Sequence, residues 1–276
     1  MPEATALRGD VRRALATLRQ RRPLVHAITN PVAMTLTANG LLACGAAAPV
    51  MAGDPAEAAE MAAVAAAVLL NLGTLHTAWA PGMRGAAQVA RRLGRPVVLD
   101  PVAVGASHVR RALAEDLLVR RLVTAVKGNA DEVLALGGDP ATPRGGAGTE
   151  AADPEAGVDA ARALCRRHHV VVIRTGPVDY ATDGGCAFEV GNGTPLLART
   201  VATGCLAGAL IAAFFAVEPP GAAAAACALA VLGVAAERAA PAAGGPGSFV
   251  PALLDALAAL SPEEAAEAAR IRPSTP

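Results

Sequence analysis

The chain of 276 residues has almost no lysine and very few aromatic side chains. Lys127 is the one lysine among 24 basic residues, and aromatic residues make up 2% of the sequence. Acidic residues also number 24, so the formal net charge is zero and the chain lacks the basic field that nucleic-acid binding needs. We therefore expect no nucleic-acid partner. With so few aromatic residues, the core has to be built from small aliphatic side chains, largely alanine, whose helix propensity is high.

The sequence also lacks paired cysteines, an apolar leader and an apolar run of membrane length. Its five cysteines are odd in number and include no CxxC pair, which argues against a disulfide framework or a zinc site and favours a reduced cytoplasm. The N-terminus carries charges and no hydrophobic stretch typical of a signal peptide. The longest apolar runs, Gly204–Val217 and Gly221–Ala236, are shorter than the roughly 18–20 residues that cross a bilayer, so we predict buried helices and no membrane partner.

Neither of the common nucleotide motifs is present. There is no GxxxxGK[ST] loop and no GxGxxG after a strand, so any ATP site must use another architecture.

Short apolar runs alternate with alanine-rich helical stretches, which predicts an α/β fold with a mostly parallel sheet flanked by helices. We predict a single domain over residues 1–276. The predicted strands are Leu24–Ile28, Val68–Leu72, Pro96–Leu99, Leu122–Val126 and Val170–Arg174. The predicted helices include Ala4–Gln20, Thr35–Cys44, Pro55–Ala66, Ala80–Leu93 and Ala130–Leu136.

Two segments depart from this rhythm. Around Val178–Leu197, alternating residues with turn signals predict an antiparallel hairpin region added to the sheet. The Gly/Pro/Ala/Thr composition of Gly137–Gly157 predicts a flexible surface loop or a partly disordered insertion.

Polar residues or glycine follow each predicted strand. The segments are Thr29-Asn30, Asn71-Leu72-Gly73-Thr74, Asp100-Pro101, Lys127-Gly128-Asn129 and Thr175-Gly176. Any one of them has a plain explanation, because turns favour these residue types. Together they favour a polar cleft, because the carboxyl ends of parallel strands share one edge of the sheet, where ligands bind.

A loop of small residues, Thr200–Gly204, leads into the apolar helix that starts near Cys205. Such a loop presents free backbone N–H groups at the positive end of a helix dipole and can bind phosphate oxygens. A thiol in the first turn is expected to have a lowered pKa. The alternative is that Thr203 is an ordinary N-cap and Cys205 an ordinary small buried residue.

Two carboxylates are candidates for a hydrated Mg²⁺. Asp100 directly follows an apolar strand and would lie at the sheet edge. Glu132 comes three residues after Asn129, which is also the spacing of a capping box, and the two roles are compatible. His26 and Asp179 show no evident partner, and we expect His26 to be a packed strand residue.

Several segments together resemble the bacterial hydroxyethylthiazole kinases, from Pro23 to about Leu260. They include Pro23–Asn30, Thr37–Leu42, Pro49–Ala52, Asn71–Leu75, Leu99–Val102, Lys127–Glu132, Thr175–Asp179, Gly204–Leu206 and Gly245–Phe249. The resemblance implies a ribokinase-like three-layer α/β fold, a homotrimer with active sites shared between subunits, and transfer of the γ-phosphate of ATP to 4-methyl-5-(2-hydroxyethyl)thiazole in thiamine salvage.

The resemblance also implies roles for individual residues. Met51, Ala202, Asn30, Gly73 and Thr74 would form the thiazole site. Lys127, Thr175 and Gly204 would contact ATP, Asp100 and Glu132 would hold Mg²⁺ through water, and Cys205 stands where many ribokinase-like enzymes place an aspartate base.

The chain departs from the family at two places. The family usually has arginine at the position of Lys127, and Thr-Gly-Ala-Gly-Cys where this chain has Val201–Cys205. Two alternatives therefore remain: a related kinase for another small alcohol, such as a hydroxymethylpyrimidine or a pyridoxal-like ring, and a ligand-binding homologue without phosphoryl transfer.

Overall fold

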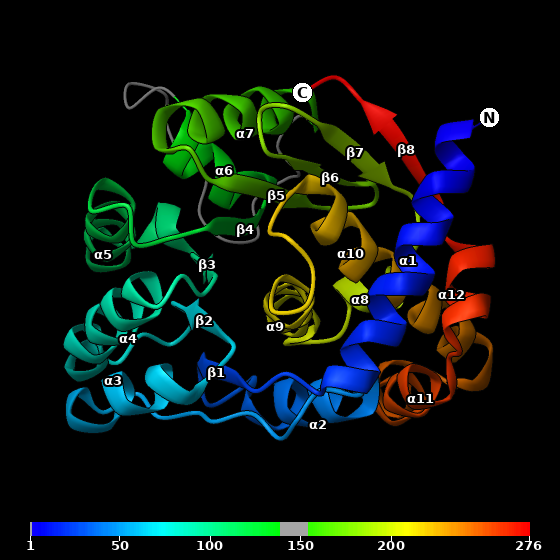
Figure 1. Ribbon diagram of the computed structural model, residues 1–276, viewed down its shortest axis with the longest axis horizontal. Coiled ribbons are helices and arrows are strands. Elements are labelled where there is room, and N and C mark those ends of the chain that lie inside the picture. The colour runs from blue at the N-terminus through cyan, green and yellow to red at the C-terminus, as the bar shows by residue number, and fades with distance from the viewer. Residues whose placement is uncertain (1, 139–153) are drawn as a thin grey trace.

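The computed structural model describes residues 2–138 and 154–276, and all eight of its strands lie in one sheet (Figure 1). The strands are β1 (Val25–Ile28), β2 (Ala67–Asn71), β3 (Val97–Asp100), β4 (Ala125–Asn129), β5 (Val171–Thr175), β6 (Asp179–Thr182), β7 (Ala187–Val190) and β8 (Ile271–Ser274). They are ordered in the sheet as in the chain. Neighbours from β1 to β5 pair in parallel, and those from β5 to β8 pair antiparallel. The predicted mostly parallel sheet and its antiparallel hairpin region are confirmed.

Helices connect and cover the strands. They are α1 (Pro2–Arg21), α2 (Met34–Cys44), α3 (Pro55–Val64), α4 (Ala80–Arg92), α5 (His108–Val119), α6 (Ala130–Gly137), α7 (Pro154–His168), α8 (Pro195–Ala198), α9 (Thr203–Phe215), α10 (Ala222–Ala239), α11 (Pro246–Ala259) and α12 (Pro262–Ala268). The sequence marks the start of α3: the Asp54 carboxylate caps this helix, and Pro55 occupies its first position, as predicted.

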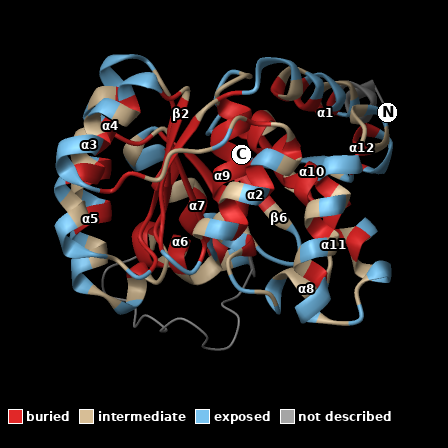
Figure 2. Cartoon of the chain, turned by 90° about the horizontal axis from the view of Figure 1, so that it is seen from below, coloured by how far each residue is buried: buried red, intermediate tan, exposed pale blue. Residues whose placement is uncertain are grey.

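Each face of the sheet carries its own hydrophobic core. Alternate strand residues such as Ala27 and Leu69 pack against α1, α2 and α9 to α12, whereas Ile28 and Leu70 pack against α3 to α7. This alternation follows from the opposite direction of successive side chains in a strand. Figure 2 shows the buried sheet between the two layers of helices. The three-layer arrangement is therefore confirmed.

Alanine dominates the core on the side of α9 and α10. Both helices are buried over nearly all their length, as predicted for the two apolar runs. By length and composition, Ala222–Ala242 could cross a membrane, but 83% of its apolar window is buried inside the protein. The helix therefore acts as a core helix here, with small side chains that let it approach the sheet closely.

Two predictions about the chain need correction. The fourth strand spans Ala125–Asn129 rather than Leu122–Val126, because Leu122 and Val123 are buried in the core before the strand starts to pair with β3. Of the predicted loop 137–157, residues 139–153 lie outside the described residues, and residues 154–157 form the first turn of α7. The edge strand β8 had not been predicted.

Candidate active site

The strands β1 to β5 bring five polar side chains to the carboxyl edge of the parallel sheet. Asn30 follows β1, Asn71 and Asp100 end β2 and β3, Lys127 lies in β4, and Thr175 ends β5. The register places Asn71 beside Asp100, and Asn129 beside Thr175. The prediction that the strand-end residues share one edge is therefore confirmed.

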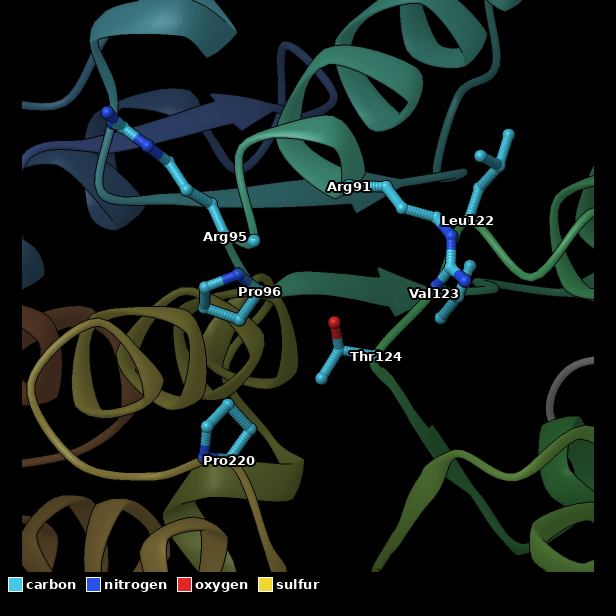
Figure 3. A pocket seen from close by; sticks show the side chains of 8 residues that line it. Arg91, Arg95, Pro96, Leu122, Val123, Thr124 and Pro220 are labelled. Carbon is cyan, nitrogen blue, oxygen red and sulfur yellow. The ribbon is translucent and has the colours of Figure 1, made fainter.

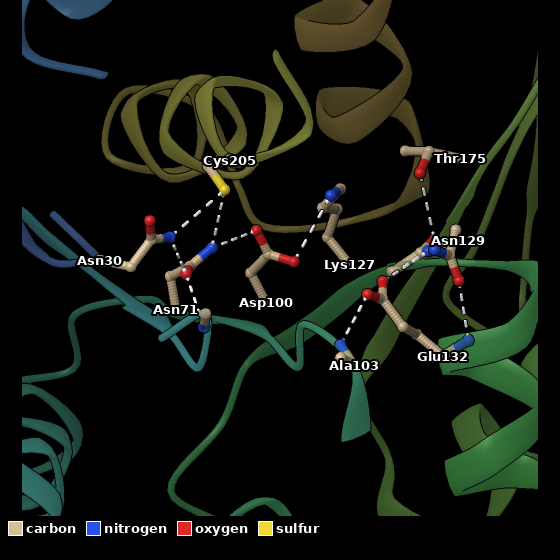
Figure 4. Close-up of polar contacts among 11 residues, drawn as sticks. Asn30, Asn71, Asp100, Ala103, Lys127, Asn129, Glu132, Thr175 and Cys205 are labelled. Carbon is tan, nitrogen blue, oxygen red and sulfur yellow. Dashed lines mark hydrogen bonds and ion pairs between the residues drawn. The ribbon is translucent and has the colours of Figure 1, made fainter. Parts of the chain in front are cut away.

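Hydrogen bonds link four of these side chains into a row (Figure 4). The Asn30 Nδ2 donates to Asn71 Oδ1 at 2.8 Å, and Asn71 Nδ2 donates to Asp100 Oδ2 at 2.6 Å. The Lys127 Nζ lies 3.4 Å from Asp100 Oδ1. All four side chains are buried. Buried polar groups have to find partners, and the contacts of this row provide them for Asn30, Asn71 and Asp100.

Asp100 and Lys127 form a buried ion pair at the centre of this row. Burial raises the pKa of Asp100 to about 6, although Lys127 and the amide of Asn71 oppose the shift. Burial also opposes the charge on Lys127, but the carboxylates of Asp100 and Glu132 together raise its pKa. We conclude that Lys127 is charged at neutral pH. It faces both Asp100 and Glu132, so one ammonium compensates the negative charge of the two carboxylates only in part.

Cys205 lies in the first turn of α9, above this row. Its Sγ accepts from Asn71 Nδ2 at 3.2 Å and from Asn30 Nδ2 at 3.7 Å. The lowered thiol pKa that we predicted is wrong: burial and the Asp100 carboxylate raise the pKa, and Lys127 and the two amides offset this only partly. At neutral pH the sulfur therefore carries its proton most of the time.

The start of α9 excludes the alternative in which Thr203 is an ordinary N-cap. Ala202 is the capping residue, with a left-handed conformation of φ 71° and ψ 0°, and it offers no side-chain acceptor. The Thr203 hydroxyl donates backwards to the carbonyl oxygens of Leu197 and Thr200. The first N–H groups of α9 therefore have no side-chain partner among the described residues, as an anion-binding helix start requires. Lys127 Nζ lies close to Gly204 at this helix start.

Glu132 is tied to backbone groups on two sides. Its Oε2 accepts from Asn129 N and its Oε1 from Ala103 N, at 2.9 and 3.0 Å. The predicted capping box with Asn129 is confirmed. Each carboxylate oxygen has a second lone pair, so Glu132 can still accept from a water molecule. Among the described residues, no three His, Cys, Asp or Glu side chains gather to hold a metal ion directly.

The remaining predicted residues lie around this row. The Thr175 hydroxyl donates to the Gly128 carbonyl oxygen at 3.3 Å across the β4–β5 pair. An added Cβ on Gly73 would meet Asn30 Nδ2 at 2.6 Å and Asn71 Oδ1 at 2.9 Å, so this close approach requires glycine. Thr74 has a positive φ of 42°. Met51 and Ala202 are both partly buried against the core that contains α9.

Sequence reasoning gave no role to Asn71 and no partners to His26 and Asp179. The structure places Asn71 in contact with Asp100 and Cys205. The His26 ring contacts the Ala52 carbonyl oxygen at 2.8 Å, which fixes the segment after Met51, and Asp179 accepts from Gly176 N. The sequence marks Asn71 as a strand-end residue, but no spacing in the chain relates it to Cys205.

A cavity of about 210 Å³ lies at the other end of the strands (Figure 3). Arg91, Arg95, Thr124 and Pro220 contribute to its lining. It contains no carboxylate, thiol or ammonium group and lies before β3 and β4, so it is separate from the polar row. The polar row at the carboxyl edge is therefore the candidate active site.

Comparison with known proteins identifies the family of the chain. The model of the hydroxyethylthiazole kinase family matches residues 15–263. The hydroxyethylthiazole kinase of Cereibacter sphaeroides is 49% identical over 258 residues, covering 93% of this chain and 96% of that protein. That of Methanoculleus marisnigri is 47% identical and covers 93% of this chain and 91% of its own length.

Solved structures agree. A hydroxyethylthiazole kinase protein from Pyrococcus horikoshii superposes with a TM-score of 0.85 at 40% identity, covering 96% of this chain and 99% of that one. A ribokinase-like superfamily protein from Enterococcus faecalis, 13% identical, has a TM-score of 0.57 over 85% of each chain and bears on the fold alone. The predicted ribokinase-like fold is confirmed, and the chain belongs to the hydroxyethylthiazole kinase family.

Proposed function

We propose that this chain transfers the γ-phosphate of MgATP to the hydroxyl of 4-methyl-5-(2-hydroxyethyl)thiazole, which yields the thiazole phosphate used to make thiamine. Family membership supports the reaction. The observation that carries it is the bonded row from Asn30 to Lys127 beneath Cys205 and the start of α9. The row combines a buried cation with a helix start that has no side-chain cap, and both stabilise a phosphoryl group during transfer, while the carboxylate would hold Mg²⁺.

Each end of the row has a separate task. Lys127 and the N–H groups at Gly204 would neutralise the phosphate oxygens, with Thr175 as a further contact to ATP. Met51, Asn30, Ala202, Gly73 and Thr74 would surround the thiazole, and Asn30 also contacts Cys205 through its Nδ2. In the reaction, the bond from the γ-phosphorus to the β,γ-bridging oxygen breaks, and a bond to the substrate hydroxyl oxygen forms.

The hydroxyl proton passes to the minor thiolate form of Cys205, which becomes the thiol, or to water. Because the raised pKa keeps the thiol mainly protonated, Cys205 is a weak contributor rather than an indispensable base. Phosphoryl transfer depends on positioning and charge neutralisation more than on proton abstraction, so this weak base is sufficient.

The carboxylates fit a hydrated Mg²⁺ rather than a directly bound ion. Asp100 is a buried carboxylate with incomplete charge compensation, and Glu132 keeps free lone pairs on both oxygens. Mg²⁺ in nucleotide sites usually keeps several waters and takes one or two carboxylates plus phosphates, which matches this donor set. When bound, Mg²⁺ would supply charge neutralisation at the phosphates.

We further propose a cytoplasmic homotrimer with active sites shared between subunits. Val32 and Val201 are 61% and 72% exposed, although they adjoin Asn30 and Ala202 at the site. Exposed apolar side chains beside a site are typical of surfaces that a partner covers. Light scattering on the purified protein tests the assembly.

A product assay tests the function. Purified protein, MgATP and hydroxyethylthiazole should give thiazole phosphate and equimolar ADP, whereas a hydroxymethylpyrimidine should give much less. Product only from the pyrimidine or from pyridoxal would establish a kinase for another alcohol. If no alcohol is phosphorylated by folded protein that binds ATP or the thiazole, the chain is a ligand-binding homologue.

A further inference from the structure

Asn71 uses every hydrogen-bonding position of its amide at the active site. Its Nδ2 donates to Asp100 Oδ2 at 2.6 Å and to Cys205 Sγ at 3.2 Å. Its Oδ1 accepts from Asn30 Nδ2 at 2.8 Å and from Gly73 N at 2.9 Å. An amide has two N–H donors and two lone pairs on its oxygen, so no position is left over. The side chain is 1% exposed, and solvent does not compete for these contacts.

Backbone groups determine which end of each amide faces the sulfur. The Gly73 N–H can only donate, so the Asn71 atom that it contacts has to be the oxygen. The Ala33 N–H donates to Asn30 Oδ1 at 3.1 Å and fixes the second amide in the same way. Both Nδ2 groups are therefore directed towards Cys205, and neither amide can turn over without breaking a bond to the backbone.

We infer that Asn71 is a positioning residue that acts through Cys205: together with Asn30, it holds the sulfur as a hydrogen-bond acceptor and favours its anionic form. Two N–H donors stabilise negative charge on an atom more than they stabilise the neutral atom. They also fix where the sulfur lies in the first turn of α9. A thiolate sulfur has three lone pairs, so two accepted bonds leave one that can take up a proton. The role of the sulfur rests on the proposed function, but its hydrogen bonds are present without substrate.

The rate of alkylation of Cys205 by iodoacetamide tests this inference without any substrate. The Asn71→Asp variant keeps the shape and removes both donors. If the new carboxyl group is protonated, its proton bonds to Asp100, and the sulfur still loses a donor. We expect alkylation at pH 8 to slow by about tenfold, the change in thiolate fraction that one pKa unit makes. The exposed Cys186 should react at an unchanged rate in the same sample and serves as the internal control.

A second variant guards against a folding defect. Asn71→Ala removes the donor without adding a carboxyl group, and we expect Cys205 alkylation to slow in this variant too. Peptide mapping assigns the label to Cys205, and the Cys205→Ala variant, which should lack the labelled peptide, is the control for that assignment. If Cys205 reacts in both folded variants within twofold of its rate in the unchanged protein, the inference is wrong.

The kinetic constants kcat and KM separate a role of Asn71 in positioning the sulfur from a purely structural role. Asn71→Asp should lower kcat and leave the KM for ATP within about twofold, because in the proposed reaction the sulfur serves the substrate hydroxyl and not the nucleotide. In the Cys205→Ala background the same substitution should have little further effect on kcat. An equal loss in both backgrounds would mean that Asn71 acts through Asp100 instead. If the unchanged protein makes no thiazole phosphate, the proposed function fails, and the alkylation rates still decide the role of Asn71.

Discussion

Replacing Ala202 with glycine should stabilise the protein, although the same change in a helix normally destabilises. Ala202 has a φ of 71°, a left-handed conformation that costs a residue with a Cβ about 1–2 kcal/mol. Glycine avoids this cost but gains freedom in the unfolded chain, which offsets about 0.4–1 kcal/mol. The net expected gain is about 0.5–1 kcal/mol in the free energy of unfolding. For a chain of this size that corresponds to about 2 °C in Tm.

The matched control is Ala16→Gly. Ala16 is exposed in the interior of α1, where glycine should cost about 1 kcal/mol. Urea denaturation of the two variants beside the unchanged protein should therefore give shifts of opposite sign. Destabilisation by Ala202→Gly of the size seen for Ala16→Gly would refute the reasoning, because it would mean that the left-handed conformation carries no strain. The thiazole KM of Ala202→Gly also shows whether the methyl group restricts the substrate.

Three further predictions concern the row of polar side chains. Cys205→Ala should reduce kcat without abolishing it, since the thiol is a weak base; complete loss in a folded variant would contradict this. Lys127→Met should raise the KM for ATP at least tenfold, whereas Lys127→Arg keeps the charge and should stay within about threefold; equal effects would show that charge is not what matters at this position. Asp100 has a pKa of about 6 in the folded protein, above its ordinary value of 3.8. Between these two pH values the folded state therefore keeps a proton on Asp100 that the unfolded state has released. The stability of the unchanged protein relative to Asp100→Asn should therefore fall as pH rises from about 4 to about 6 and then level off. Urea denaturation at several pH values measures this, and a relative stability that rises over that range would show that the pKa is lowered instead.

The sequence was sufficient to predict the parallel strands and the edge at which the polar residues gather. This worked because buried apolar runs and the turns that follow them are local features. Strand β4 was placed three residues early because Leu122 and Val123 are as apolar as strand residues, and only pairing with β3 and β5 decides which residues join the sheet. Strand β8 is not predictable from the pattern, because Arg272 and Pro273 interrupt its apolar residues, which an edge strand tolerates.

The active site was predictable as a set of residues but not as a network. Asp100, Lys127 and Cys205 could be named from the motifs of the chain. The bonds from Asn71 to Asp100 and Cys205 join residues 29 and 134 positions apart, and no local pattern encodes them. The same holds for the thiol of Cys205: the helix start alone predicts a lowered pKa, whereas its burial and the nearby carboxylate raise it. Electrostatic environment depends on distances that only the folded chain supplies.

The alanine-rich core around α9 and α10 has a consequence for mutational tolerance. Nearly half of its buried side chains, such as Ala212 and Ala230, have one methyl group, so truncation at these positions removes little volume and leaves no large cavity. Enlargement is the harmful direction, because each added methylene has to displace a neighbour in a closely packed layer. Few substitutions in this core should therefore be neutral. Related proteins with the same alanine-rich core should differ mainly in the core on the other face of the sheet, where Leu and Val can exchange with repacking.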